Sequence, residues 1–303
     1  MSKLLLLLMA ATLLPSLGCE QSSGVEFVFV TDLDGDRDIA TLVEGSNYVL
    51  LTQNTVADED PDLTPDGRRI VFASDRFGSF DVFTAKISGS VRSTKLTSLI
   101  RLTDDPAADR SPSISPGGDD VLFESNRTGE RQIYIIKRDG TGLQQLTTTT
   151  GGNWAPAWSV AGGEIAFASA RQGRAEIYTM LPDGTDQQRL TTGEADADAP
   201  AWSPDGTNIA FVSRRRGNVD LFVLKVADGT VRRLTDDPAV ESDPAWLPDG
   251  SRVAFGSDRS GDPDLYIVAA DASWLPGGFI SGSEVGDTDV TWAIAAAEGP
   301  AGQ

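Results

Sequence analysis

Residues 199–222 read APAWSPDGTNIAFVSRRRGNVDLF, and variants of this segment begin at Asp60, Ser111, Ala155 and Asp243. Short apolar runs divided by Pro-Asp-Gly and other glycine-containing turns, at a period near 44 residues, are typical of β-propeller blades. Each copy offers four strands, which we expect to form an antiparallel meander. One phenylalanine keeps its place in every copy, with spacings of 51, 44, 44 and 44 residues: Phe72, Phe123, Phe167, Phe211 and Phe255.

The two ends of the chain each supply part of a sixth blade. Residues 27–42, FVFVTDLDGDRDIATL, align without a gap on residues 253–268, but no first strand precedes them. The missing element is at the other end, where DVTW at 289–292 repeats DPAW at 243–246. We therefore expect an all-β, six-bladed β-propeller over residues 25–297. It should be closed by pairing of the C-terminal strand with the N-terminal strands, since closure removes exposed sheet edges.

The N-terminus is typical of an exported protein. A lysine precedes an apolar run at residues 4–14, too short to cross a bilayer as a mature helix, so residues 1–18 read as a signal peptide. The following Cys19 resembles the acylated cysteine of bacterial lipoproteins, although Ser16 stands where that family usually has leucine. Ordinary signal-peptidase cleavage is the alternative. Residues 19–24 then form a lipidated cysteine and tether, and residues 298–303 a flexible tail.

Composition excludes several classes of function. The net charge of −20 opposes binding to nucleic acid and favours cations or basic partners. Histidine is absent, which removes the usual general base of serine and cysteine hydrolases and the commonest zinc ligand. Cys19 is the single cysteine, so no internal disulfide can form. We expect a monomer that is not an enzyme, needs no cofactor, and contacts a membrane only through its N-terminal lipid.

Four acids alternate in the turn at residues 31–40, TDLDGDRDIA: Asp32, Asp34, Asp36 and Asp38. Calcium loops of this type place glycine directly after the third acid, whereas Gly35 falls between the second and the third. Other blades also carry acids in the equivalent loop. We therefore favour a plain acidic hairpin turn and predict no metal site, with calcium binding as the open alternative.

The connections between blades are dense in acids and lead directly into the innermost strands. In this strand order they lie on the face opposite the Pro-Asp-Gly turns, so we expect the last acids of each connection to ring the mouth of the central channel. A negative ring attracts cations and basic partners, although acids can also simply solvate loops. Trp154 lies in a connection at the same end and is a candidate binding anchor, unless it packs under its own loop. The candidate partner-binding residues are Trp154, Asp58, Glu59, Asp60, Asp109, Asp198, Asp243, Asp287 and Asp289.

Two further residue types recur at fixed positions, a tryptophan in four blades and an arginine in every blade except the N-terminal one. Tryptophans at a fixed first-strand position should fill the space between neighbouring sheets. Arginines in the loop between second and third strands should pair with acids of neighbouring blades. The two sets are Trp158, Trp202, Trp246 and Trp292, and Arg76, Arg127, Arg171, Arg215 and Arg259.

The repeat PAWSPDGTNIAFVSRRRGNVDLF, followed by RRLTDDPA, resembles that of the TolB-type propeller of the bacterial Tol-Pal envelope system. The resemblance covers nearly all of the mature chain. It implies a periplasmic scaffold whose propeller mouth accepts a peptidoglycan-associated lipoprotein or an extended peptide, here anchored, we expect, to the outer membrane. TolB itself has an α/β domain before its propeller and no lipid, whereas here the first blade begins within ten residues of Cys19. A calcium- or carbohydrate-binding propeller, or an accessory propeller of a peptidase or lyase system, is the alternative.

Overall fold

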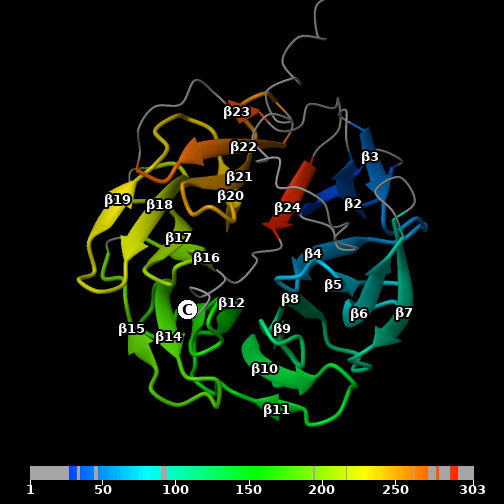
Figure 1. Ribbon diagram of the computed structural model, residues 1–303. Coiled ribbons are helices and arrows are strands. Elements are labelled where there is room, and N and C mark those ends of the chain that lie inside the picture. The colour runs from blue at the N-terminus through cyan, green and yellow to red at the C-terminus, as the bar shows by residue number, and fades with distance from the viewer. Residues whose placement is uncertain are drawn as a thin grey trace, which may run out of the picture.

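Six four-stranded antiparallel sheets stand radially around a central axis in the computed structural model (Figure 1). This confirms the predicted all-β, six-bladed propeller. The structure describes residues 27–32, 35–43, 47–89, 94–193, 195–215, 217–261, 263–271, 278–279 and 287–292. In residues 42–43, 47, 278–279 and 287–292 only the backbone is described. The signal peptide, Cys19, the tether and the tail predicted from the sequence lie outside these ranges.

In each blade the strands run in order from the axis outward. The innermost strands are β4 (Asp58–Leu63), β8 (Asp109–Ile114), β12 (Asn153–Trp158), β16 (Ala197–Trp202), β20 (Glu241–Trp246) and β24 (Asp287–Trp292). The second strands are β5 (Arg69–Ser74), β9 (Asp120–Ser125), β13 (Ile165–Ser169), β17 (Asn208–Ser213), β21 (Arg252–Ser257) and β1 (Phe27–Thr31). The third strands are β6 (Asp81–Ser88), β10 (Gln132–Lys137), β14 (Glu176–Met180), β18 (Asp220–Lys225), β22 (Asp264–Ala269) and β2 (Asp38–Val43). The outermost strands are β7 (Lys95–Arg101), β11 (Gln144–Gln145), β15 (Gln188–Arg189), β19 (Val231–Arg233), β23 (Gly278–Phe279) and β3 (Asn47–Leu50).

The ring is closed as the sequence predicts, by a blade built from both ends of the chain. Strand β24 runs antiparallel to β1, with Phe27 opposite Trp292 and Thr31 opposite Asp287. Figure 1 shows this pairing as the red arrow beside the blue strands. Because the last strand is the innermost strand of the first blade, both ends of the chain are held in one sheet and the ring is closed.

The spacing of 51 residues between Phe72 and Phe123 has a local cause. Strands β6 and β7 are 8 and 7 residues long, whereas β11 and β15 have only 2 residues each. The additional residues lengthen this outer hairpin and leave the inner strands unchanged.

Aromatic pairs form the centre of five blades, whereas in the first blade Phe29 lies opposite Ala40. Phe72, Phe123, Phe167 and Phe211 are completely buried, and each stacks on the aromatic ring opposite it on the third strand, for example Phe123 on Tyr134 at 5.6 Å. Trp202 and Trp246 are also buried, which confirms the predicted core position for these two first-strand tryptophans. Trp158 is half-buried, and the side chain of Trp292 lies outside the described residues. The described residues contain no helix that could cross a membrane.

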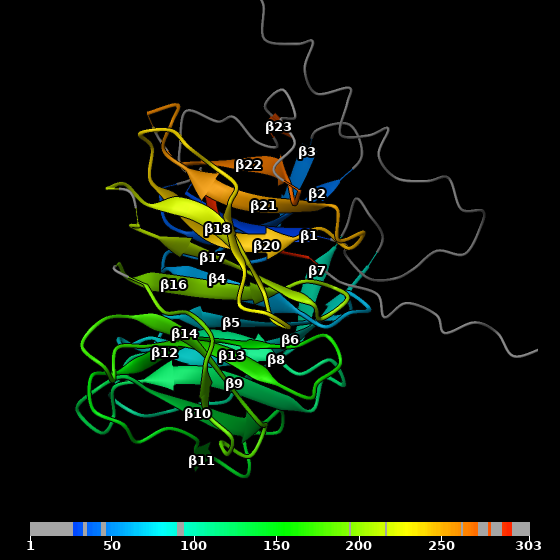
Figure 2. The same cartoon turned by 90° about the vertical axis from the view of Figure 1, so that its left-hand side faces the viewer.

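The blades present their connections on two opposite faces, seen edge-on in Figure 2. The first residue of each innermost strand lies opposite the last residue of the second strand, as Asp58 lies opposite Ser74. The loops between second and third strands therefore lie on the same face as the starts of the innermost strands. We call this face the loop face. The Pro-Asp-Gly turns are on the other face, as the sequence predicts.

Candidate functional site at the propeller axis

Five innermost strands share a bulge near the loop face. The third residue of each has a positive φ between 46° and 51°, and the next residue is proline. Pairing with the second strand shifts register there, for example between Glu59 and Asp62. Such a conformation costs about 1–3 kcal/mol per residue and re-aims the neighbouring groups. The five residues are Asp60, Ser111, Ala155, Ala199 and Asp243.

Carboxylates satisfy the backbone N–H groups that these bulges release. The Ser111 N–H donates to the carboxylate of Asp60 in the preceding blade at 2.9 Å. The Ala155 N–H donates to Glu124 at 2.9 Å. The Ala199 N–H donates to the neighbouring Asp198 carboxylate at 2.7 Å. These acids therefore have a structural role, because an unsatisfied buried N–H is costly.

The same acids form a cluster around the axis, which we call the axial carboxylates. Burial, together with the charges of Glu59, Asp243 and Glu124, raises the pKa of Asp60 to about 6, although the hydrogen bond from Ser111 opposes the shift. Burial also raises the pKa of Asp198, as does the charge of Asp243. Mutual repulsion across blades shows that these side chains converge. The axial carboxylates are Glu59, Asp60, Glu124, Asp198 and Asp243.

Three arginines neutralise part of this charge. Glu59 accepts from Arg37 at 2.8 Å and from Arg110 at 2.5 Å, so it bridges two blades. Arg131 lies 3.5 Å from Glu124. Five carboxylates thus face three guanidinium groups. Negative charge remains in excess, and Asp60, Asp198 and Asp243 are only partly buried.

Trp154 lies at this cluster but is not an isolated loop residue. It is the second residue of β12, equivalent to Glu59 and Asp198 in other blades, so it belongs to an innermost strand and not to the connection in which the sequence placed it. Its indole N–H donates to Asp198 at 2.6 Å, and Arg131 lies over its ring at 4.4 Å. The ring is half-buried and packs on the core of the next blade, with its remaining surface at the axis.

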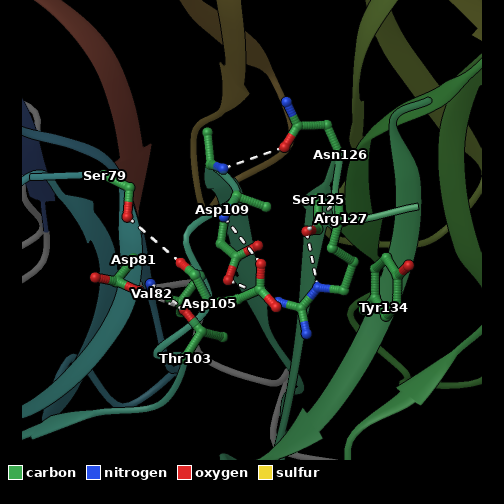
Figure 3. A network of polar contacts seen from close by, with 12 residues as sticks. Ser79, Asp81, Val82, Thr103, Asp105, Asp109, Ser125, Asn126, Arg127 and Tyr134 are labelled. Carbon is green, nitrogen blue, oxygen red and sulfur yellow. Dashed lines mark hydrogen bonds and ion pairs between the residues drawn. The ribbon is translucent and has the colours of Figure 1, made fainter. Parts of the chain in front are cut away.

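Two of the predicted mouth acids differ from the expectation. Asp58 and Asp109 are the first residues of their strands and are completely buried, so neither faces the axis. Figure 3 shows Asp109 meeting Arg127, whose side chain runs beside the Tyr134 ring. Asp287 and Asp289 lie in β24, where only the backbone is described.

The loop arginines pair within their own blades, not with neighbouring blades as expected. The reason is the register, because the first residue of the innermost strand lies opposite the residue two positions before the arginine. Each guanidinium also lies over the aromatic rings of the second and third strands. The bonds are Arg76 to Asp58 at 2.9 Å, Arg127 to Asp109 at 2.8 Å, Arg171 to Asn153 at 2.8 Å and Arg259 to Glu241 at 2.7 Å.

Glu124 was not predicted from the sequence, because only the acids of the connections between blades were considered and the acids within the strands were not. The signal was available in the repeat. Glu124 is the penultimate residue of β9, where the other second strands carry small or apolar residues: Val30, Ala73, Ala168, Val212 and Gly256. A single acid at a position that is otherwise apolar marks a local function of that blade.

The acidic turn at residues 31–40 is a tight hairpin in its described part. The Gly35 N–H donates to the Asp32 carbonyl at 3.0 Å, with a φ of 106° at Gly35. Asp38 is buried and accepts from the Thr52 hydroxyl at 2.8 Å. Asp34 lies outside the described residues. Within the described ranges, no three metal-ligating side chains come together.

Similar proteins place this geometry in context. A segment of 103 residues is 32% identical to an uncharacterized protein of Agrobacterium fabrum, and the match covers 34% of this chain and 33% of that relative. The chain thus matches about a third of that relative's length.

Solved propellers superpose on most of the chain. TolB from Acinetobacter baumannii gives a TM-score of 0.71 at 20% identity over 90% of this chain and 67% of its own. A putative TolB from Agrobacterium tumefaciens gives 0.67 at 22% over 84% and 89%. Oligogalacturonate lyase from Vibrio parahaemolyticus gives 0.55 at 14% over 83% and 88%. At these identities the likeness shows the fold alone.

A family model gives the assignment. The model of the TolB beta propeller domain matches residues 97–198 and 193–277, which together cover more than half of the chain. The repeats that form the blades are therefore repeats of this family, and the chain belongs to the TolB β-propeller domain family.

Proposed function

We propose that this chain is a non-catalytic protein of the bacterial cell envelope whose axial carboxylates bind a cationic segment of a protein or peptide partner. The single observation that carries the proposal is the convergence of five carboxylates from four blades on three guanidinium groups among the described residues, with Asp60, Asp198 and Asp243 only partly buried. A lysine or arginine of a partner would offset the cost of burying these charges and their mutual repulsion, which together raise the pKa of Asp60 and Asp198.

Trp154 supplies the apolar part of the same surface. Its ring is fixed between Arg131 and Asp198, so little conformational entropy is lost when a partner covers it. Fixed aromatic residues beside polar groups are frequent anchors of protein interfaces. The proposed surface is therefore Trp154 with Asp60, Asp198 and Asp243.

Catalysis is the less favoured alternative. The likeness to oligogalacturonate lyase is one of fold, and the chain has no histidine to serve as a general base. Excess negative charge at the axis would also repel uronates, which are themselves anions. The axial residues fit cation recognition better than they fit proton transfer to an anionic sugar.

Direct binding of short peptides tests the proposal. Fluorescence anisotropy would compare a labelled basic peptide with an acidic peptide of the same length, on the wild type and on Asp60→Asn/Asp243→Asn. We expect the basic peptide alone to bind, with its Kd raised about tenfold in the double variant, equivalent to about 1.4 kcal/mol. Asp139→Asn/Asp183→Asn, on the opposite face, is the matched control and should bind normally. Equal binding to all three proteins would refute the axial site.

The proposed location has a separate test. Lipid attachment to Cys19 predicts that the wild type incorporates labelled palmitate and sediments with membranes, whereas Cys19→Ala remains in the periplasmic fraction. Unlabelled wild type in the soluble fraction would contradict the anchor, and it would leave the binding proposal standing.

A further inference from the structure

Arg215 is the exception among the loop arginines. Four sister arginines direct their Nη2 atoms to a side-chain oxygen at the start of the innermost strand, at 2.7–2.9 Å. Their Nε atoms all donate to the serine that ends the second strand. In Arg215 both Nε and Nη2 are buried and have no hydrogen-bond acceptor among the described residues. Burying these N–H groups without an acceptor costs free energy of folding. The Nε and Nη2 atoms also form the edge of a guanidinium group that can bind a carboxylate with two parallel hydrogen bonds.

One local change explains why Nη2 is bare. The first residue of β16 is Ala197, where the sister blades have Asp58, Asp109, Asn153 and Glu241. Ala197 therefore removes the acceptor that the sister Nη2 atoms use. The Ser213 hydroxyl donates to the backbone carbonyl of Asp196 at 2.6 Å, as Ser169 donates to Gly152 at 3.3 Å, but unlike Ser169 it accepts no bond from its arginine.

The Arg215 side chain has also left the position that its sisters occupy. Its Cζ lies 5.8 Å from the third-strand ring of Phe222, whereas the sister distances are 4.6, 4.8, 4.4 and 4.5 Å. The guanidinium leans toward Gly193, where an added Cβ would lie 3.1 Å from Nη2.

This arc of the loop face also carries Arg171 and Arg214. In the neighbouring blade, Arg171 has only neutral hydrogen-bond partners among the described residues, namely Ser169, Gln187 and Asn153. Arg214, beside Arg215, is exposed. An anion that approaches this arc meets two guanidinium groups that no described carboxylate neutralises.

We propose that Arg215 is a carboxylate-binding site, and that a carboxylate of a ligand occupies the place that Asp58, Asp109 and Glu241 fill in the sister blades. Those blades show the fit directly, because a carboxylate oxygen lies 2.7–2.9 Å from the equivalent Nη2. The planar fork of arginine matches a carboxylate better than it matches a spherical ion. The site is separate from the axial carboxylates and opposite in sign, so it does not depend on the function proposed above.

Thermal unfolding in acetate tests the site, with chloride at equal ionic strength as the reference. A ligand at ten times its Kd raises the folding equilibrium constant about elevenfold. For a chain of this size we expect acetate to raise the Tm by about 3 °C relative to chloride. Ala197→Asp supplies the carboxylate internally and should abolish the acetate response. Because an acid could misfold there, Ala197→Asn and Arg215→Leu serve as second variants with the same expected loss.

The control is Ala161→Asp, which adds the same charge at an exposed position of the turn between β12 and β13, on the opposite face, and should keep the response. Three results would overturn the proposal. The first is an equal acetate response in the wild type and the Ala197 and Arg215 variants. The second is equal stabilisation by chloride and acetate. The third is a response that appears only in Glu194→Gln, which would show that the chain's own carboxylate, next to Gly193 in sequence, fills the site.

Discussion

Replacing Asp60 by asparagine should stabilise the protein at neutral pH, although the change removes a charge that accepts a hydrogen bond. Asp60 has a pKa of about 6 in the folded protein against an ordinary value of 3.8, mainly because burial penalises its charge. A tenfold change in an acid dissociation constant corresponds to about 1.4 kcal/mol, so the ionised carboxylate costs up to about 3 kcal/mol at pH 7.5. An asparagine carbonyl can still accept from the Ser111 N–H. We expect a net gain of about 1–2 kcal/mol.

The sign of the pH dependence follows from linkage. A carboxyl group with a raised folded pKa holds its proton in the folded state while the unfolded chain releases it. Its contribution to stability is therefore complete below about pH 3.8 and is lost as the pH rises through about 6. The gain from Asp60→Asn should consequently be largest at pH 7.5 and decrease toward pH 4.

Urea unfolding at several pH values between 4 and 7.5 would measure this difference. Asp139→Asn is the control, because hydrogen bonds from Thr141 lower the pKa of this exposed residue and the substitution should not stabilise at any pH. A second measurement is the carboxyl carbon titration of Asp60 by NMR. An Asp60 that titrates below pH 4, or a variant that is less stable than the wild type at pH 7.5, would refute the argument that the axial cluster is under electrostatic strain.

Three further predictions concern the fold. Arg127→Leu leaves the buried Asp109 carboxylate without its ion pair and should cost about 3–5 kcal/mol in urea unfolding, and a cost below about 1 kcal/mol would contradict the pairing. Gly184→Ala should cost clearly more than Gly206→Ala, since both have positive φ but only at Gly184 would the Cβ lie 2.8 Å from a carbonyl oxygen; equal melting temperatures would be inconsistent with this contact. Deleting residues 287–303 removes β24 from the first blade and should abolish cooperative thermal unfolding, so an unchanged calorimetric transition would show that closure is dispensable.

The fold could be predicted because a propeller translates directly into sequence. One blade is a unit of four short strands, and repeating it repeats every turn and every core position, so the spacing of Phe72, Phe123 and their equivalents fixes the number of blades. The incomplete repeats at the two ends then require closure. The irregular spacing of 51 residues does not change the predicted number of blades, because the additional residues lie in the outer hairpin of β6 and β7.

The site was less predictable because a backbone bulge determines which acids face the axis. In sequence, Asp58 and Asp60 are two acids of one connection. In the structure Asp58 is buried against Arg76. Asp60, the third residue of β4, has a positive φ and is turned toward the axis. A change of one or two positions along a bulged strand exchanges buried and exposed side chains. Charge density along the connections therefore predicted Glu59, Asp60, Asp198 and Asp243 near the axis, but it also included the buried Asp58 and Asp109 and missed Glu124.

Departures from the repeat carry the information that the repeat itself lacks. Residues shared by most blades, such as the aromatic pairs and the loop arginines other than Arg215, are explained by packing and need no ligand. The exceptions are Glu124, an acid where other blades are apolar, and Ala197, an apolar residue where other blades accept a hydrogen bond. Each exception leaves a charge imbalance in one blade, negative at the axis and positive at Arg215. A ring of equivalent blades acquires specific recognition where that equivalence is broken, so these two blades are where ligands should first be sought.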